Sequence, residues 1–256
     1  METFLYIFIS VLAVSTVSLA GLFAFSLHAS LLHRILFILV GLAAGSLIGD
    51  AVIHLIPEAL EKIGNERTFG IAVLAGVIAF FILEKYLRWH HAHHGPEEEH
   101  EAEEREHHPR HLAPLVLIAD GLHNTVDGAI IAASYFISPA VGVATTIAVF
   151  LHEIPQEIAD YALLIHSGLS RGKALLFNFF SALTAILGAI LVVVLQDTIG
   201  SLGALVAAFT AGAFIYIGAT DLIPELQKTK NPKQSAVELA AFMSGIILML
   251  ALTFLE

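Results

Sequence analysis

The sequence predicts an all-α polytopic membrane protein with eight transmembrane helices, and its composition, its apolar runs and its basic residues all point to this class. Hydrophobic residues occupy 57% of the 256 positions, and the mean hydropathy is +0.82. A soluble domain of this length cannot bury so many apolar side chains. The absence of cysteine excludes a disulfide framework and a thiolate metal site.

Apolar runs of about 20 residues, the length needed to cross a bilayer, recur along the whole chain. The first run carries Glu2 and has no basic leader, so we expect a retained span rather than a cleaved signal. The expected spans are 3–27, 35–59, 69–89, 112–135, 140–165, 172–195, 200–225 and 235–255.

The basic residues predict the orientation of these spans. Lys62 and Arg67 lie in a loop that follows an even-numbered span. The other Lys and Arg follow odd-numbered spans: Arg34, Lys85, Arg88, Arg105, Arg110, Arg171, Lys173, Lys228, Lys230 and Lys233. Because Lys and Arg accumulate in cytoplasmic loops, we expect the odd-numbered loops in the cytoplasm and both termini on the extracytoplasmic side.

One transmembrane domain over residues 1–256 is expected, interrupted by the polar loop 90–111, HHAHHGPEEEHEAEEREHHPRH. The loop contains eight of the 14 histidines and seven Glu. Such a biased run cannot bury a core, so we expect a disordered cytoplasmic loop. It is either a solvated linker or a low-affinity metal-binding loop, since clustered histidines recruit transition metals.

Two segments of the sequence match at a constant offset of 167 residues. The segment 44–58, AGSLIGDAVIHLIPE, corresponds to 211–225, AGAFIYIGATDLIPE. Under the expected topology the two copies cross the membrane in opposite directions, and inverted repeats are typical of secondary transporters. Pro57 and Pro224 each remove a helix hydrogen bond, so we expect both helices to be disturbed there.

Ionisable side chains in the two copies are candidates for the path of a transported ion. Asp50, His54 and Glu58 are spaced to share one helix face toward the outer mouth. Asp221 and Glu225 share a face toward the inner mouth. They either line an outer access path and an inner exit path, or they are interfacial residues at helix ends.

A ridge of small residues follows one face of the second span. Gly41, Gly45 and Gly49 recur every four residues, and such small-xxx-small ridges let two membrane helices approach closely. The ridge therefore indicates either close packing inside the molecule or a dimer interface.

The strongest functional signal lies in the fourth and fifth spans, where polar residues interrupt apolar sequence. The strings are DGLHNTVDG at 120–128 and LHEIPQEIAD at 151–160. Ionisable groups are costly in hydrocarbon and therefore indicate a functional site. The candidate metal ligands are His123, Asn124, Asp127, His152, Glu153, Gln156 and Glu157.

Helical spacing predicts how these residues meet. His123 and Asp127 share one face, as do His152 and Gln156, and a short loop makes the two spans antiparallel neighbours near the bilayer midplane. Nitrogen and oxygen donors without sulfur suit Zn²⁺, Fe²⁺, Mn²⁺, Co²⁺, Ni²⁺ or Cd²⁺. Asp120 and Asp160 are expected to orient a ligating histidine. The alternative is a set of buried polar residues that join helices.

The paired strings HNTVDG and HEIPQE resemble the signatures of the ZIP (Zrt/Irt-like) divalent metal transporters, in the LIV-1-like branch whose second motif is HExPHE. The resemblance implies a 3+2+3 helical arrangement with inverted repeats, and often a homodimer. It also implies uptake of zinc or a similar ion into the cytoplasm by alternating access. It assigns His123, Asp127, His152 and Gln156 to a primary site, and Asn124, Asp127 and Glu153 to a second site.

The chain departs from this family pattern in two places. Gln156 replaces the second histidine of the motif, which gives a neutral and weaker ligand. Some members place a Glu in the sixth span at the second site, whereas the sixth span here has no acidic residue before Asp197. These departures affect the expected metal preference and the occupancy of the second site.

Other function classes remain open at this point. HEIPQ begins like the HExxH helix of zinc hydrolases, but Gln156 stands where the second histidine must be. A metal exporter with six spans and a metal-gated channel or sensor are further alternatives. We expect a transporter without enzymatic activity or a cofactor, which takes Zn²⁺, Fe²⁺, Mn²⁺ or Cd²⁺ as substrate. The expected partners are this metal and the lipid bilayer, not nucleic acid, and the simplest location is a bacterial inner membrane.

Overall fold

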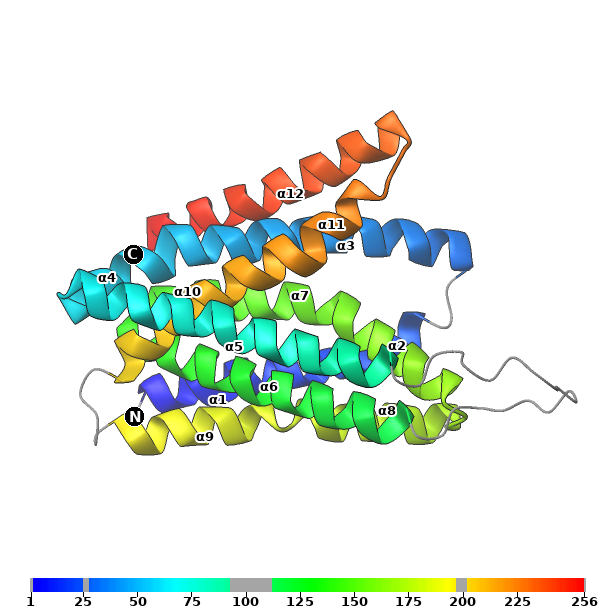
Figure 1. The fold of residues 1–256 in the computed structure, drawn as a ribbon, viewed down its shortest axis with the longest axis horizontal. Coiled ribbons are helices and arrows are strands. Elements are labelled where there is room, and N and C mark those ends of the chain that lie inside the picture. The colour runs from blue at the N-terminus through cyan, green and yellow to red at the C-terminus, as the bar shows by residue number, and fades with distance from the viewer. Residues whose placement is uncertain (1, 25–27, 93–111, 197–201, 256) are drawn as a thin grey trace, which may run out of the picture.

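The computed structural model describes residues 2–24, 28–92, 112–196 and 202–255, which form a bundle of long helices without a strand (Figure 1). The α-helices are α1 (Glu2–Ser15), α2 (Ala20–Ala24), α3 (Ala29–Asp50), α4 (Ile56–Ile63), α5 (Glu66–Ala92), α6 (Leu112–Ile137), α7 (Pro139–His166), α8 (Arg171–Ala182), α9 (Ala185–Gln196), α10 (Leu202–Ile217), α11 (Ile223–Gln227) and α12 (Pro232–Leu252). Nearly all of the polar loop expected at 90–111 lies outside the described residues.

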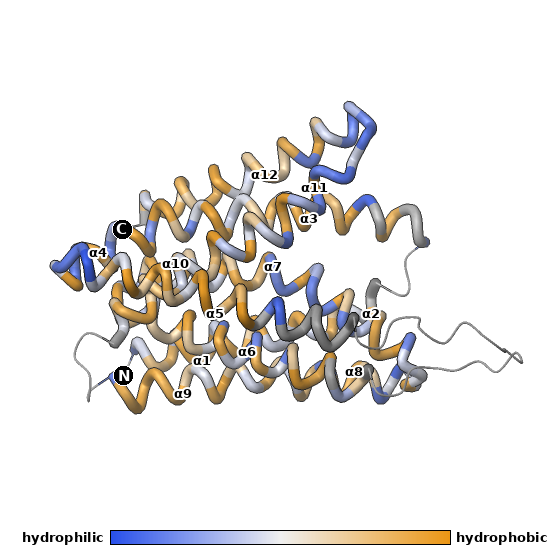
Figure 2. The backbone as a smooth tube through the Cα atoms, viewed as in Figure 1, coloured by the Kyte–Doolittle hydropathy of each residue, from blue (hydrophilic) through white to orange (hydrophobic). Residues whose placement is uncertain are grey.

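The protein is an integral membrane protein. By length and composition, five stretches of the described residues can cross a membrane: Glu2–Leu22, Arg34–Ile63, Arg171–Gln196, Gly203–Gln227 and Pro232–Leu252. The helices are apolar along most of their length, and hydrophilic residues gather at α4 and at the turn between α11 and α12 (Figure 2). α6 and α7 have 26 and 28 residues but contain polar residues at their centres, which lower their hydropathy.

Two of the predicted spans are less regular than expected. The first contains a 3₁₀ turn, η1 (Thr16–Leu19), between α1 and α2. The sixth divides into α8 and α9, and at the break Thr184 Oγ1 donates to the Gly121 carbonyl of α6 at 2.6 Å. Serine and threonine hydroxyls compete for the hydrogen bonds of the helical backbone. A hydropathy average does not register this competition, so it does not show these breaks.

The two copies of the repeat fold alike. A π-helical turn occupies Ala51–Leu55 (η2) in the first copy and Gly218–Leu222 (η3) in the second, again 167 residues apart. Each turn comes just before the helix that contains Pro57 or Pro224. The helix is thus irregular next to both prolines, as expected. A wider turn relieves the clash between a proline ring and the preceding helical turn. α3 and α10, which lead into these turns, run in opposite directions (Figure 1).

The helix pairs around the repeat also correspond. α3 packs on α12, and α10 packs on α5. A Cβ at Gly45 would lie 2.0 Å from the Phe242 carbonyl oxygen, and one at Gly212 would lie 2.0 Å from the Val73 carbonyl oxygen. Any side chain at these crossings would force the helices apart. The glycine ridge of α3 therefore packs inside the molecule, against α12.

α6 and α7 form the centre of the bundle. α6 contacts α7, α9 and α10, while α7 contacts α1 and α3, so both lie between the α1/α9 side and the α3/α10 side (Figure 1). The polar residues of α6 and α7 therefore lie in the interior of an otherwise apolar bundle.

Candidate metal centre

A tight turn sets the register of α6 against α7. Ser138, with an extended backbone, caps α7 by accepting a hydrogen bond from the Val141 N–H at 3.1 Å, and Pro139 begins the helix. The single connecting residue makes the two helices antiparallel. His123 and His152 then both lie about 20 Å from the turn, at a rise of about 1.5 Å per residue.

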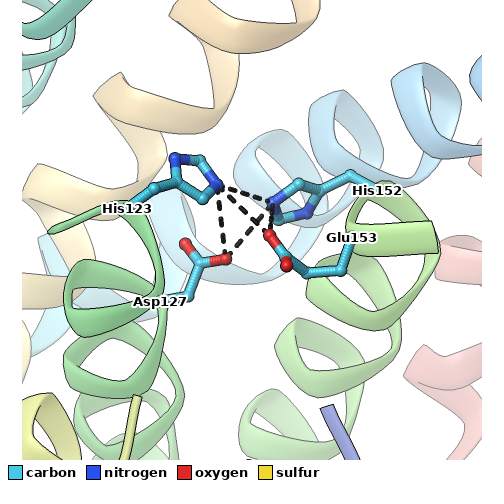
Figure 3. A group of neighbouring side chains, drawn as sticks. All are labelled: His123, Asp127, His152 and Glu153. Carbon is cyan, nitrogen blue, oxygen red and sulfur yellow. Dashed lines mark hydrogen bonds and ion pairs between the residues drawn. The ribbon is translucent and has the colours of Figure 1, made fainter. Parts of the chain in front are cut away.

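Four side chains meet between these helices: His123, Asp127, His152 and Glu153 (Figure 3). The two Nε2 atoms of the histidines lie 3.3 Å apart. Glu153 Oε1 lies 3.3 Å from each of these nitrogens. Asp127 Oδ2 lies 3.3 Å from His152 Nε2 and 3.6 Å from His123 Nε2. We call these four residues the quartet.

Five of the six distances between the ligand atoms of the quartet match a tetrahedral metal site. With zinc–ligand distances of about 2.0–2.1 Å, neighbouring ligand atoms of a tetrahedron lie roughly 3.3–3.4 Å apart. The five distances above are 3.3–3.6 Å. One ion can therefore contact all four side chains with little movement.

The electrostatics of the quartet also favour a cation. The side chains of Asp127, His152 and Glu153 are at most 2% exposed, and that of His123 is 13% exposed. Neither carboxylate has a hydrogen-bond donor among the described residues, apart from the two imidazoles. Burying a carboxylate without donors is costly, so a bound cation would relieve this cost.

Neighbouring groups hold and cover the imidazoles. His152 Nδ1 lies 3.3 Å from the Ala148 carbonyl oxygen, which suits a ring that presents Nε2 to a metal. Phe80 of α5 contacts His123 edge-on, and Phe214 of α10 contacts His152 edge-on. Both phenylalanines come from helices distant in the sequence, and no local motif marked them.

A cavity of about 220 Å³ reaches the quartet from one end of the bundle. Asp120 precedes His123 toward the start of α6, and Asp160 follows His152 toward the end of α7, so the cavity lies on the side of the odd-numbered loops. Its lining includes four carboxylates among apolar side chains. It comprises Phe80, Glu84, Ala119, Asp120, His123, Gln156, Asp160, Tyr216, Ile217 and Asp221.

Comparison with known proteins identifies the family. The family described as ZIP Zinc transporter matches residues 1–114 and 90–253. This chain belongs to the ZIP family. Zinc transporter SLC39A7 of Mus musculus is 29% identical over 88% of this chain and 64% of its own length. Zinc transporter ZIP13 of Pongo abelii is 30% identical over 82% and 65%. Zinc transporter zipt-7.2 of Caenorhabditis elegans is 33% identical over 87% and 59%.

These matches confirm the predicted resemblance to the LIV-1-like branch of the ZIP family. The family and the relatives are described as transporters rather than enzymes. This ZIP chain spans less than two thirds of the length of each of these three relatives.

The remaining motif residues of this ZIP chain have other surroundings. Asn124 is buried, and its Nδ2 donates to Asp120 Oδ1 at 2.8 Å. Glu157 is buried and accepts a hydrogen bond from Asn178 Nδ2 of α8 at 2.5 Å. Gln156 lines the acidic cavity beside His123. Asp120 was expected to orient a ligating histidine. It accepts its hydrogen bond instead from Asn124, the residue after His123.

The path residues expected in the two repeats differ in exposure. Asp50 and His54 are almost fully buried, 3.2 Å apart, and Thr145 of α7 donates to Asp50 at 2.8 Å. Glu58 is partly buried. Asp221 lines the acidic cavity, whereas Glu225 lies farther out and pairs with Lys228 at 2.5 Å. The structure thus brings Asp221 close to the quartet, and it places Asp50, at the end of α3, in contact with His54 and with Thr145 of α7.

Proposed function

We propose that this ZIP protein transports a divalent transition metal into the cytoplasm by alternating access, with the quartet as the central binding site. The quartet geometry is the observation that supports this most strongly. Two carboxylates and two neutral imidazoles carry a total charge of −2, so a divalent ion makes the buried centre neutral. A monovalent or trivalent ion would leave a net charge in a low-dielectric interior, which is costly.

Zinc is the first candidate substrate, and Fe²⁺, Mn²⁺ and Cd²⁺ are the others. The quartet offers two nitrogen and two oxygen donors, which suit Zn²⁺ in tetrahedral geometry. Gln156 and Asn124 supply further amide oxygens next to the quartet, in positions that the family motif assigns to ligands. We propose that they join the coordination during transfer, and that Glu157 stabilises the α7–α8 contact.

The proposed topology has eight spans in a 3+2+3 arrangement within one domain, 1–256. The 90–111 loop and the other odd-numbered loops face the cytoplasm. Two observations support it: α1 begins and α12 ends at the same end of the bundle (Figure 1), and the acidic cavity lies toward the opposite end. That cavity, with Asp221 and then Glu225, is the proposed exit path, while Glu58, His54 and Asp50 follow the outer path.

A homodimer in a bacterial inner membrane is the proposed assembly and location.

The test is metal flux into proteoliposomes, with Zn²⁺, Fe²⁺, Mn²⁺ and Cd²⁺ compared side by side. We expect His123→Ala and His152→Ala to abolish flux at normal expression, because each removes one of the four ligands while the apolar packing of the rest of the bundle remains. His166→Ala is the matched control, since His166 is exposed in the last turn of α7. Wild-type flux from either quartet variant would exclude the proposed site.

A further inference from the structure

A second cavity lies away from the quartet, between the first turns of α3 and α12. Its volume is about 490 Å³. The two helices separate from each other toward these first turns (Figure 1). The lining combines two cations, three large apolar side chains and three polar ones: Arg34, Lys233, Phe37, Ile38, Val237, Asn231, Gln234 and Glu238.

The cations of this cavity lie at the level of the membrane surface. The apolar stretches of the two helices begin at Arg34 and Pro232, so Arg34 and Lys233 flank the point where each helix enters the bilayer. Both side chains are exposed. Under the proposed topology this end of the bundle is cytoplasmic. Basic pockets between membrane helices on that side are suited to lipid head groups.

Glu238 places a buried carboxylate in the lining of this cavity, beside its two cations. The residue is 3% exposed. Its Oε1 accepts hydrogen bonds from Thr229 Oγ1 at 2.6 Å and from Gln234 Nε2 at 3.0 Å, which holds the carboxylate at the level of the α12 start. Its Oε2 is buried and has no hydrogen-bond donor among the described residues. Leaving a buried charged acceptor unpaired is costly, so a cationic donor in the cavity would stabilise this arrangement.

We propose that this cavity binds the head group of an aminophospholipid, of which phosphatidylethanolamine is the simplest. The phosphate lies between Arg34 and Lys233, and the primary ammonium donates to Glu238 Oε2. An acyl chain follows Phe37, Ile38 and Val237 toward the bilayer core. Choline head groups have no N–H to donate, and glycerol head groups have no positive charge. The site rests on the proposed topology but not on the proposed transport of metal.

Native mass spectrometry of the purified full-length protein tests this. The detergent contains equal amounts of phosphatidylethanolamine, phosphatidylcholine and phosphatidylglycerol with identical acyl chains. We expect about tenfold more retained phosphatidylethanolamine than phosphatidylcholine, as one charge-assisted hydrogen bond predicts. Glu238→Gln should remove this preference, and the double variant Arg34→Ala, Lys233→Ala should lower retention of all three lipids. Glu61→Gln and Lys173→Ala, which alter exposed charges elsewhere, are the matched controls.

A series of lipids measured on the wild-type protein tests the proposal even if Glu238→Gln does not fold. Retention by the wild-type protein should fall as the ethanolamine nitrogen receives one, two and three methyl groups. Equal retention across that series, or a preference for phosphatidylglycerol alone, would show that no ammonium binds at Glu238. Displacement of the lipid by soluble glycerophosphoethanolamine at equal concentration would show that the acyl chain contributes nothing, which would overturn the lipid assignment.

Discussion

Four of the acidic residues of α6 and α7 fall into two pairs with different hydrogen bonding. Asp120 accepts from Asn124, and Glu157 accepts from Asn178. Asp127 and Glu153 accept from no amide or hydroxyl among the described residues and face the two imidazoles instead. A buried carboxylate with amide donors is already stabilised, whereas one without them gains more from a cation. We infer that the poorly satisfied pair is the one that meets the metal.

The first prediction compares Glu153 with Gln156, the residue that the family motif places in the primary site. Glu153→Gln removes one negative charge and should weaken Zn²⁺ binding by at least about tenfold, the scale of one charged ligand contact. Gln156→Ala removes a neutral side chain and should weaken binding by less. Calorimetric titration of the detergent-solubilised protein measures both, and its melting temperature reports folding. A larger loss from Gln156→Ala would assign the ligand to Gln156 instead.

At the scale of elements, the site depends on how closely helices approach α6. A Cβ at Gly128, the residue after Asp127, would lie 1.7 Å from the Ala185 carbonyl oxygen of α9. Carbonyl backbone cannot move away as a flexible side chain can, so any larger residue must displace α9 or rotate α6. The position of Asp127 is therefore coupled to the α6–α9 crossing.

The second prediction follows from this crossing. Gly128→Ala should destabilise the protein by about 1–3 kcal/mol, as overpacking of a filled interior does, and should weaken metal binding by moving Asp127. Gly70→Ala on α5 is the control, because no atom other than those of its chain neighbours and its own helix backbone lies within 4 Å of the added Cβ. There the gain in helix propensity should stabilise the protein by up to about 1 kcal/mol. Thermal unfolding in detergent distinguishes the two; similar melting temperatures would contradict the close crossing.

Sequence periodicity predicted that the candidate ligands lie on two adjacent antiparallel helices, but not which of them form the quartet. Spacing pairs His152 with Gln156, four residues later on the same face. The structure instead joins His152 to Glu153 at 3.3 Å, because a glutamate side chain is long enough to reach around the helix. Phe80 and Phe214 cover the site from other helices, and only tertiary packing brings them there. The prolines of the repeat marked the disturbed turns, although a π-helical turn cannot be told from a bend by sequence alone.

At the scale of the whole molecule, the repeat and the position of the cavity make the structure asymmetric across the membrane. α3 and α10 run in opposite directions and carry equivalent π-helical turns. Of the five path residues, only Asp221, from the second copy, lines the cavity that reaches the quartet, while His54, its equivalent in the first copy, is buried. Under the proposed function, this is a state open to one side and closed to the other, and alternating access would exchange the two environments.

The last prediction tests this asymmetry with single cysteines, which are informative because the native chain has none. Glu61 is exposed on α4, at the end of the bundle where α1 begins and α12 ends. Glu61→Cys should therefore react with a membrane-impermeant thiol reagent added to intact cells. Asp221→Cys lies in the acidic cavity at the other side of the quartet and should react only in inside-out vesicles. The cysteine-free parent measures background labelling in both preparations. Labelling of Asp221→Cys in intact cells would place the cavity on the outer side and would contradict the proposed topology.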